Sequence, residues 1–271
     1  MKNYRWAWFT ILFVLLLVAC AIWIVHGGLV RLKWPWFAIM AILIGMSMWA
    51  GWMINGRIDG ILIDNRNRIS LSRFQWVMWL IILLGGYFTE AVWNAAHYVD
   101  FPTMDPRLYI LLGIVSGAAV ASNLIVENKK EPGAARQIAA ALPGAPAALA
   151  AGTPVVVAGL GPDPVQGAMD VNTGAADASW SELFMGEQAA DRYVVDIGRL
   201  QKLIITVLLG VAYLVWLCND LTAPKAAGLN MPSITDTFVW LLGISNGAYL
   251  AAKAPTKIPS TATQPPASGG P

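Results

Sequence analysis

Six apolar runs separated by polar segments account for most of the chain. They cover residues 6–25, 34–54, 74–97, 108–126, 203–219 and 237–252. A bilayer core about 30 Å thick needs about 20 helical residues, so four runs are long enough and the last two are slightly short. Flanking residues or local thinning of the bilayer would have to complete these two. The pattern predicts an all-α integral membrane protein with six transmembrane helices.

Composition supports lipid as the solvent. Of the 271 residues, 57% are hydrophobic and 13% are charged, where a soluble domain carries about 25% charged residues. The net charge of +2 leaves no basic surface for nucleic acid. "LVAC" at 17–20 resembles a lipoprotein cleavage site, which would leave Cys20 lipidated. Because the apolar run continues through Cys20, we interpret it as a membrane span.

The distribution of Lys and Arg predicts the orientation. If the N-terminus is cytoplasmic, 14 of the 18 Lys and Arg residues lie in cytoplasmic segments. Positive residues in short loops gather on that side of a membrane. Both termini are therefore expected to be cytoplasmic.

Part of the sequence is duplicated. "ISLSRFQ" at 69–75 is related to "VDIGRLQ" at 195–201, and "LLGIVSGAAVA" at 111–121 to "LLGISNGAYLA" at 241–251. Two spans per copy return the chain to its starting side, which predicts two parallel two-helix repeats. The expected units are an N-terminal hairpin at 1–54, repeat 1 at 55–130, a linker at 131–180, repeat 2 at 181–256 and a disordered tail at 257–271.

The two related segments start the outgoing helices of the repeats. Ser72 and Gln75 fit a capping box, and Gly198 can occupy the cap position in the second copy. A cation at a helix N-terminus is disfavoured by the helix dipole, so we expect lipid phosphate or a partner's carboxylate to compensate it. The candidate contacts with lipid or partner are Arg73, Gln75, Arg199 and Gln201.

The returning helices carry small residues at four-residue spacing. These are Gly113, Gly117 and Ala121 in the first copy, and Gly243, Gly247 and Ala251 in the second. Such ridges allow close helix packing in lipid. We expect them to pack helices, including against each other, rather than to line a pore.

The polar segments between the spans differ in kind. Residues 131–178 are rich in Ala, Gly and Pro, which is typical of a flexible linker. Residues 60–71 and 182–197 alternate β-favouring residues around a polar turn, which predicts two small cytoplasmic surface hairpins. Together these hairpins would form a docking platform.

One polar face lies inside a predicted span. Helical spacing places Tyr87, Glu90, Asn94 and His97 together, and an intramembrane acid is a functional candidate. Interhelical hydrogen bonding is the competing interpretation, and we extend it to Ser245 and Asn246. One His and one Glu make a poor metal site. No nucleophile elbow, catalytic carboxylate pair or P-loop is present, so we expect no enzyme activity, cofactor or metal.

The pairing of "SLSRFQ" with "LLGIS" resembles a family of uncharacterised bacterial multi-pass inner-membrane proteins. The resemblance covers both repeats, but not the first two spans or the linker. It departs where Asp196 and Gly198 replace serines, and it implies a bacterial inner-membrane location without an activity.

These observations favour a membrane scaffold that presents cytoplasmic segments to a protein partner, with membrane lipids and a second copy of the chain as further contacts. A small channel or transporter that uses Glu90 is the alternative. An intramembrane enzyme comes third.

Overall fold

The structure is a computed structural model and describes residues 2–27, 32–129, 170–187, 192–221 and 228–253. Six long helices dominate these residues: α1 (Lys2–Gly27), α2 (Lys33–Asn55), α3 (Leu71–Ala96), α4 (Pro106–Lys129), α7 (Ile197–Asp220) and α8 (Asp236–Lys253). Three single-turn 3₁₀ helices accompany them: η2 (Gly60–Leu62), η3 (Ala175–Asp177) and η4 (Trp180–Leu183). The described residues contain no strand, so the predicted all-helical class is confirmed.

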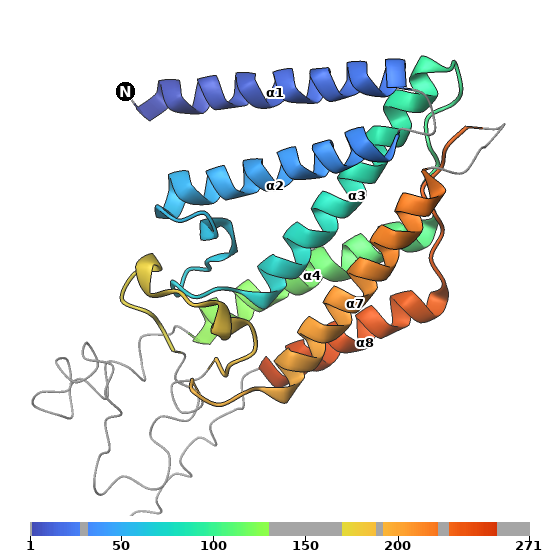
Figure 1. The fold of residues 1–271 in the computed structure, drawn as a ribbon. Helices are drawn as coiled ribbons and strands as arrows, with labels where there is room; N and C mark the ends of the chain where they lie inside the picture. The colour runs from blue at the N-terminus through green and yellow to red at the C-terminus, as the bar shows by residue number, and fades with distance from the viewer. Residues whose placement is uncertain (1, 28–31, 130–169, 188–191, 222–227, 254–271) are drawn as a thin grey trace, which may run out of the picture.

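Successive long helices alternate in direction (Figure 1). The last turns of α1, α3 and α7 and the first turns of α2, α4 and α8 therefore lie at one end of the bundle, and the described segments that precede α3 and α7 lie at the other. Helix α3 is central and contacts α1, α2, α4 and α7, while α8 packs on α4 and α7.

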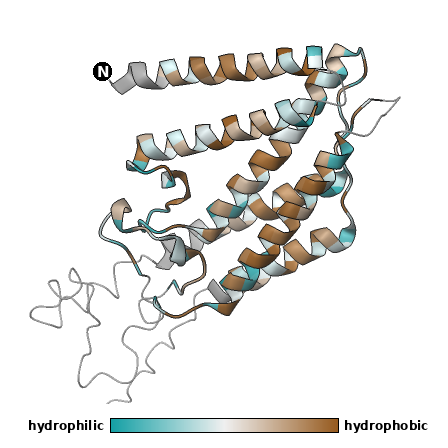
Figure 2. Cartoon of the chain, in the orientation of Figure 1, coloured by the Kyte–Doolittle hydropathy of each residue, from teal (hydrophilic) through white to brown (hydrophobic). Residues whose placement is uncertain are grey.

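Four helices are long and apolar enough to cross a membrane: α1 from Ala7 onward, α2, α3 and α7. The apolar part of α4 within the described residues, Pro106–Ser122, is shorter. Hydrophobic residues run along much of α1 (Figure 2). Many of them face outward: Trp8 is 71% exposed and Leu15 is 60% exposed. Apolar helices of this length with an apolar exterior indicate a membrane protein.

The core of the bundle lies where α3 meets α7 and α8. Trp79 packs against Tyr213 and edge-on against Phe238, with ring centroids 6.1 and 5.8 Å away. Close approach depends on Gly86, because a Cβ there would lie 2.7 Å from Cδ2 of Leu217. Packing of this kind holds helices together in lipid, where burial alone supplies little driving force.

Both helix starts differ from the sequence prediction. Helix α3 begins at Leu71 after Ser70, without a side-chain capping bond. Gln75 is instead completely buried in the bundle. Helix α7 is capped by Asp196, whose Oδ1 accepts a hydrogen bond from the backbone N–H of Arg199 at 3.1 Å. The capping-box prediction was wrong because Gln75 faces the neighbouring helices rather than the helix end.

The small-residue ridges also lie elsewhere than expected. Gly113, Gly117 and Gly247 are exposed, and an added Cβ at any of them would meet no described atom within 4 Å. Ala121 is half-buried, Ala251 is exposed, and Gly243 approaches only Ile114. Within the described residues the ridges do not face each other. Larger side chains form the buried faces of α4 and α8 instead: Leu108, Leu111, Val115, Leu242 and Tyr249.

The predicted linker contains structure at its end. Residues 170–180 are described, and Asp170 and Ala178 in this stretch are 8% and 5% exposed. The rest of the linker and the predicted tail lie outside the described residues.

Candidate functional site

The two segments that precede α3 and α7 pack together at one end of the bundle. We define the platform as residues 57–70, 170–187 and 192–196 (Figure 1). Its small apolar core includes Leu62, Ile69 and Leu183, all less than 9% exposed. Each segment was predicted to form a hairpin, and each contains one isolated antiparallel bridge: Ile63 with Ile69, and Met185 with Val195.

The first segment turns tightly between its paired residues. Oδ1 of Asp64 accepts hydrogen bonds from the backbone N–H groups of Arg66 and Arg68, at 2.8 and 3.3 Å. Asn67 has a φ of 57°, a left-handed conformation that Asn adopts more readily than most residues. This turn directs both arginines toward the second segment.

Buried ion pairs join the two segments. Arg66 contacts Glu187 at 3.4 Å, and Arg68 contacts Asp170 at 3.0 Å and Glu182 at 3.7 Å. Both arginine side chains are 2% exposed and the three carboxylates at most 10%. Breaking a buried pair by removing one partner costs about 3–5 kcal/mol, so the network specifies a single arrangement of the segments.

The carboxylate of Glu182 also bonds to both segments. Its Oε2 accepts a hydrogen bond from the backbone N–H of Ile69 at 2.7 Å, and its Oε1 one from Nδ2 of Asn172 at 2.7 Å. Asn172 and Asn67 each donate from Nδ2 to the backbone carbonyl of the other, at 2.9 and 3.2 Å. Residues more than 100 positions apart are thus held by paired hydrogen bonds.

The pKa values of the two arginines shift in opposite directions. Burial lowers the pKa of the Arg68 guanidinium, and the carboxylates of Asp170 and Glu182 only partly offset this. Burial also acts to lower the pKa of Arg66, but Glu187 and Asp64 outweigh it and leave the pKa above its usual value. At the edge of the platform, hydrogen bonding to Arg57 lowers the pKa of Asp59.

Polar contacts continue from the platform into the bundle. Arg199 in α7 contacts Oε1 of Glu187 at 2.8 Å. The phenol of Tyr249 in α8 donates to the same oxygen at 3.0 Å. The ammonium of Lys202 lies 3.9 Å from the centre of the Tyr249 ring and 3.2 Å from Oγ of Ser72 in α3. Three helices therefore meet at a completely buried lysine.

More polar side chains lie one helical turn deeper. Helices α3 and α7 run away from the platform and α8 runs toward it (Figure 1), so positions 75, 206 and 245–246 lie at a similar depth. All these side chains are at most 5% exposed. We define the polar layer by its members, Ser72, Gln75, Lys202, Thr206, Ser245, Asn246 and Tyr249.

Several polar atoms of this layer lack a hydrogen-bond partner among the described residues. They are Nε2 and Oε1 of Gln75, Oγ1 of Thr206, Oγ of Ser245 and Oδ1 of Asn246. Each buried polar group left unsatisfied costs about 1–3 kcal/mol. Several together approach the whole stability of a typical domain, about 5–15 kcal/mol, which makes a dry layer unfavourable.

The four residues predicted to contact lipid or a partner differ in how deeply they are buried. Arg199 is 2% exposed and is bonded to Glu187 and to the backbone carbonyl of Glu182 at 2.5 Å. A carboxylate compensates this cation, as one alternative predicted, but the carboxylate belongs to the same chain. Arg73 is half-buried and donates to the carbonyl of Ile63 at 2.6 Å. Gln75 is buried, and only Gln201 is exposed.

The predicted intramembrane cluster lies in the half of α3 away from the platform. Glu90 is completely buried and Asn94 is 1% exposed, whereas Tyr87 is half-buried and His97 is exposed. Asn94 exchanges two 2.8 Å hydrogen bonds with the backbone of Leu229 and donates to the carbonyl of Asp100 at 2.9 Å. These bonds join α3 to the backbone of loop residues, whereas the competing interpretation predicted hydrogen bonds between helices.

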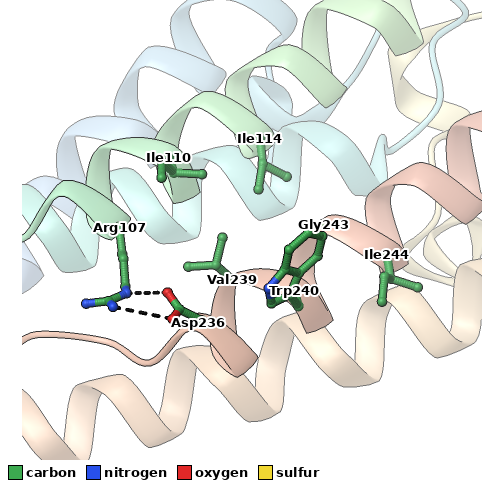
Figure 3. Close-up of a pocket in the computed structure, with 8 residues that line it drawn as sticks. All are labelled: Arg107, Ile110, Ile114, Asp236, Val239, Trp240, Gly243 and Ile244. Atoms are coloured by element: carbon green, nitrogen blue, oxygen red, sulfur yellow. Dashed lines mark hydrogen bonds and ion pairs between the residues drawn. The ribbon is translucent and has the colours of Figure 1, made fainter.

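A groove of about 480 Å³ lies between α4 and α8 at the same end (Figure 3). Arg107 and Asp236 form an ion pair of 2.5 Å at one end of it. Apolar residues line the rest, including Ile110, Ile114 and Trp240. An open apolar groove on the exterior of this bundle has the shape and chemistry to accommodate a lipid chain.

Sequence reasoning missed the carboxylates that hold the platform together. Asp170 and Glu182 were treated as parts of a linker and of a separate hairpin. The usable signal was charge balance: Arg66 and Arg68 needed acidic partners, and Asp170, Glu182 and Glu187 are acids on the same predicted side of the membrane.

Comparison of the chain with protein-family models, curated proteins and solved structures gives no match. Its function must therefore be argued from the platform and the bundle themselves.

Proposed function

We propose that the protein is a scaffold or anchor of the bacterial inner membrane that presents the platform to a protein partner or a larger assembly. In this proposal six helices span the membrane and both termini are cytoplasmic, as the distribution of Lys and Arg favours. The platform then lies on the cytoplasmic surface.

One observation carries the proposal: an internally cross-linked platform with exposed apolar side chains. Trp180 is 50% exposed, Tyr193 74% and Val194 61%. Buried ion pairs fix the segments that carry them, so a partner would bind a preformed surface and lose little conformational entropy. Exposed aromatic residues are the usual anchors of such interfaces.

The proposal also includes the two parallel repeats, α3–α4 and α7–α8. Their support is that α3 and α7 leave the platform in the same direction and that α4 and α8 return beside each other. A duplicated unit would explain why both platform segments precede a helix in the same way.

Site-specific photo-crosslinking in native membranes tests the scaffold. A photoreactive residue would replace Trp180 or Tyr193, and Phe101, which is 69% exposed at the opposite end, serves as the matched control position. We expect a discrete protein adduct from the platform positions and none from position 101. Adducts with lipid alone from both platform positions would contradict the scaffold and leave these residues as membrane contacts.

A channel or transporter is the second candidate, favoured by the complete burial of Glu90 in α3. An acidic group inside a span marks ion or proton pathways. Replacing Glu90 by Gln keeps the shape and removes the charge. Unchanged flux of protons and small ions in reconstituted vesicles would contradict this role.

A further inference from the structure

We propose that the polar layer is a hydrated site inside the bundle, which binds water molecules and opens toward the platform. This inference does not depend on the scaffold function. It rests on the buried polar atoms of α3, α7 and α8 that have no partner among the described residues.

The chemistry of these atoms favours water over an ion. The amide nitrogen of Gln75 and the hydroxyls of Thr206 and Ser245 can donate, whereas Oε1 of Gln75 and Oδ1 of Asn246 can only accept. An anion would satisfy only the donors and a metal ion only the acceptors. Water does both, and buried waters typically make about three hydrogen bonds to such groups.

Lys202 marks the side from which water enters. Its ammonium lies in the platform-facing part of the layer, 3.9 Å from the ring of Tyr249, whose phenol reaches Glu187 in the platform. Polar groups therefore continue from the platform to the layer. Hydration of the layer also lowers the cost of keeping an ammonium group inside an apolar bundle.

Large side chains close the layer on the other side. Trp79 and Leu83 in α3 and Leu242 in α8 are at most 2% exposed, and the indole Nε1 of Trp79 is their one buried polar side-chain atom without a partner among the described residues. They occupy the next turns toward the opposite end, where Trp79 packs against Tyr213. In this proposal the layer is a water-filled recess that is reached from the platform side, and these side chains separate it from the opposite end.

Cysteine accessibility tests the recess. Thr206→Cys and Ser245→Cys place a thiol in the layer on two different helices, in a background where Cys20 and Cys218 are replaced by Ala. Val207→Cys is the matched control, because Val207 adjoins Thr206 in sequence but is 39% exposed on the apolar exterior. Ile197→Cys, at a position 78% exposed, reports full access at the platform end.

A small cationic methanethiosulfonate would be added to either face of sealed vesicles. We expect Thr206→Cys and Ser245→Cys to react from the platform side at least about tenfold faster than Val207→Cys, because thiolate forms only where water reaches the sulfur. Reaction of both layer cysteines no faster than Val207→Cys, while Ile197→Cys reacts normally, would overturn the proposal. Faster reaction from the opposite side would overturn it as well.

A variant with a misfolded bundle could also admit the reagent. Each protein is therefore compared with Leu83→Cys, at a position 2% exposed in the apolar barrier. We expect no reaction at position 83 from either face. Equal labelling of positions 83 and 206 would mean that the bundle is generally permeable, and the proposed one-sided recess would be refuted.

Discussion

The phenol of Tyr249 donates a 3.0 Å hydrogen bond to Oε1 of Glu187, and this contact ties the last helix of the bundle to the platform. Arg199 reaches the same oxygen at 2.8 Å. One carboxylate of the platform therefore contacts both α7 and α8.

Removing the Tyr249 hydroxyl separates the hydrogen bond from the ring contact. Tyr249→Phe keeps an aromatic ring beside Lys202 and should lower the free energy of unfolding by about 1 kcal/mol. Tyr249→Leu also removes the cation–π contact and should cost about 1–2 kcal/mol more. Equilibrium unfolding in detergent measures the loss of stability in each variant. Tyr109→Phe, at a position that is 61% exposed, is the control for removal of a hydroxyl group. Equal stability of wild type and Tyr249→Phe would contradict a stabilising hydrogen bond between Tyr249 and Glu187.

Two arginines that share Asp170 offer a matched test of burial. Arg68 is 2% exposed at 3.0 Å from Asp170, and Arg192 is 31% exposed at 3.3 Å. We expect Arg68→Ala to destabilise the protein by about 3–5 kcal/mol, because it leaves buried carboxylates uncompensated. Arg192→Ala should cost less than about 1 kcal/mol. Similar losses for both variants would show that burial does not set the strength of these pairs.

Gly51 in α2 and Gly60 in η2 face each other and allow the two elements to approach closely. A Cβ on Gly51 would lie 2.7 Å from the backbone nitrogen of Ile61, so Gly51→Ala must displace backbone. We expect a loss of about 1–3 kcal/mol, typical of overpacking. Gly45→Ala lies in the same helix with nothing within 4 Å and should be neutral or slightly stabilising. Thermal unfolding in detergent would compare them, and a neutral Gly51→Ala would contradict the close approach.

The Arg57–Asp59 pair predicts a specific dependence on pH. Since Arg57 lowers the pKa of Asp59, the pair stabilises the folded protein above the unfolded pKa of about 3.9 and this contribution disappears as pH falls through the lower folded pKa. Arg57 is 29% exposed, so the effect should be about 1 kcal/mol at most.

Stability measured from pH 7 down to about pH 2 in wild type and Asp59→Asn tests this dependence. The difference between the two proteins should be constant at neutral pH and shrink toward the acidic end. A difference that does not change with pH would refute the predicted role of Asp59 ionisation.

The hydrophobic pattern predicted the long helices well, because an apolar segment in lipid must satisfy its backbone hydrogen bonds internally and a helix does so. The cap of α7 was expected at Gly198, two residues after the observed cap at Asp196, although the apolar run itself starts only at position 203. The pattern did not predict the tertiary partners of the polar residues in between. Arg199 illustrates this: from sequence it looked like a surface cation, yet its partners Glu182 and Glu187 lie 17 and 12 positions earlier. Local pattern carries no information on such pairings.

The residues of the polar layer were partly visible in sequence. Ser245 and Asn246 were expected to make interhelical contacts, whereas Gln75 was interpreted as a helix cap and Lys202 as a cytoplasmic charge. The sequence shows which residues share one face of a helix. Which other helix packs against that face depends on the tertiary arrangement.

The sequence by itself determined that this protein is helical, apolar and built from elements of membrane length, because those properties follow from hydrophobicity and period along the chain. Only the tertiary structure decided that residues 57–70, 170–187 and 192–196 form one platform and that a lysine and several polar side chains meet inside the bundle. These features depend on ion pairs and helix contacts between residues more than 100 positions apart, and such contacts form only when the whole chain packs.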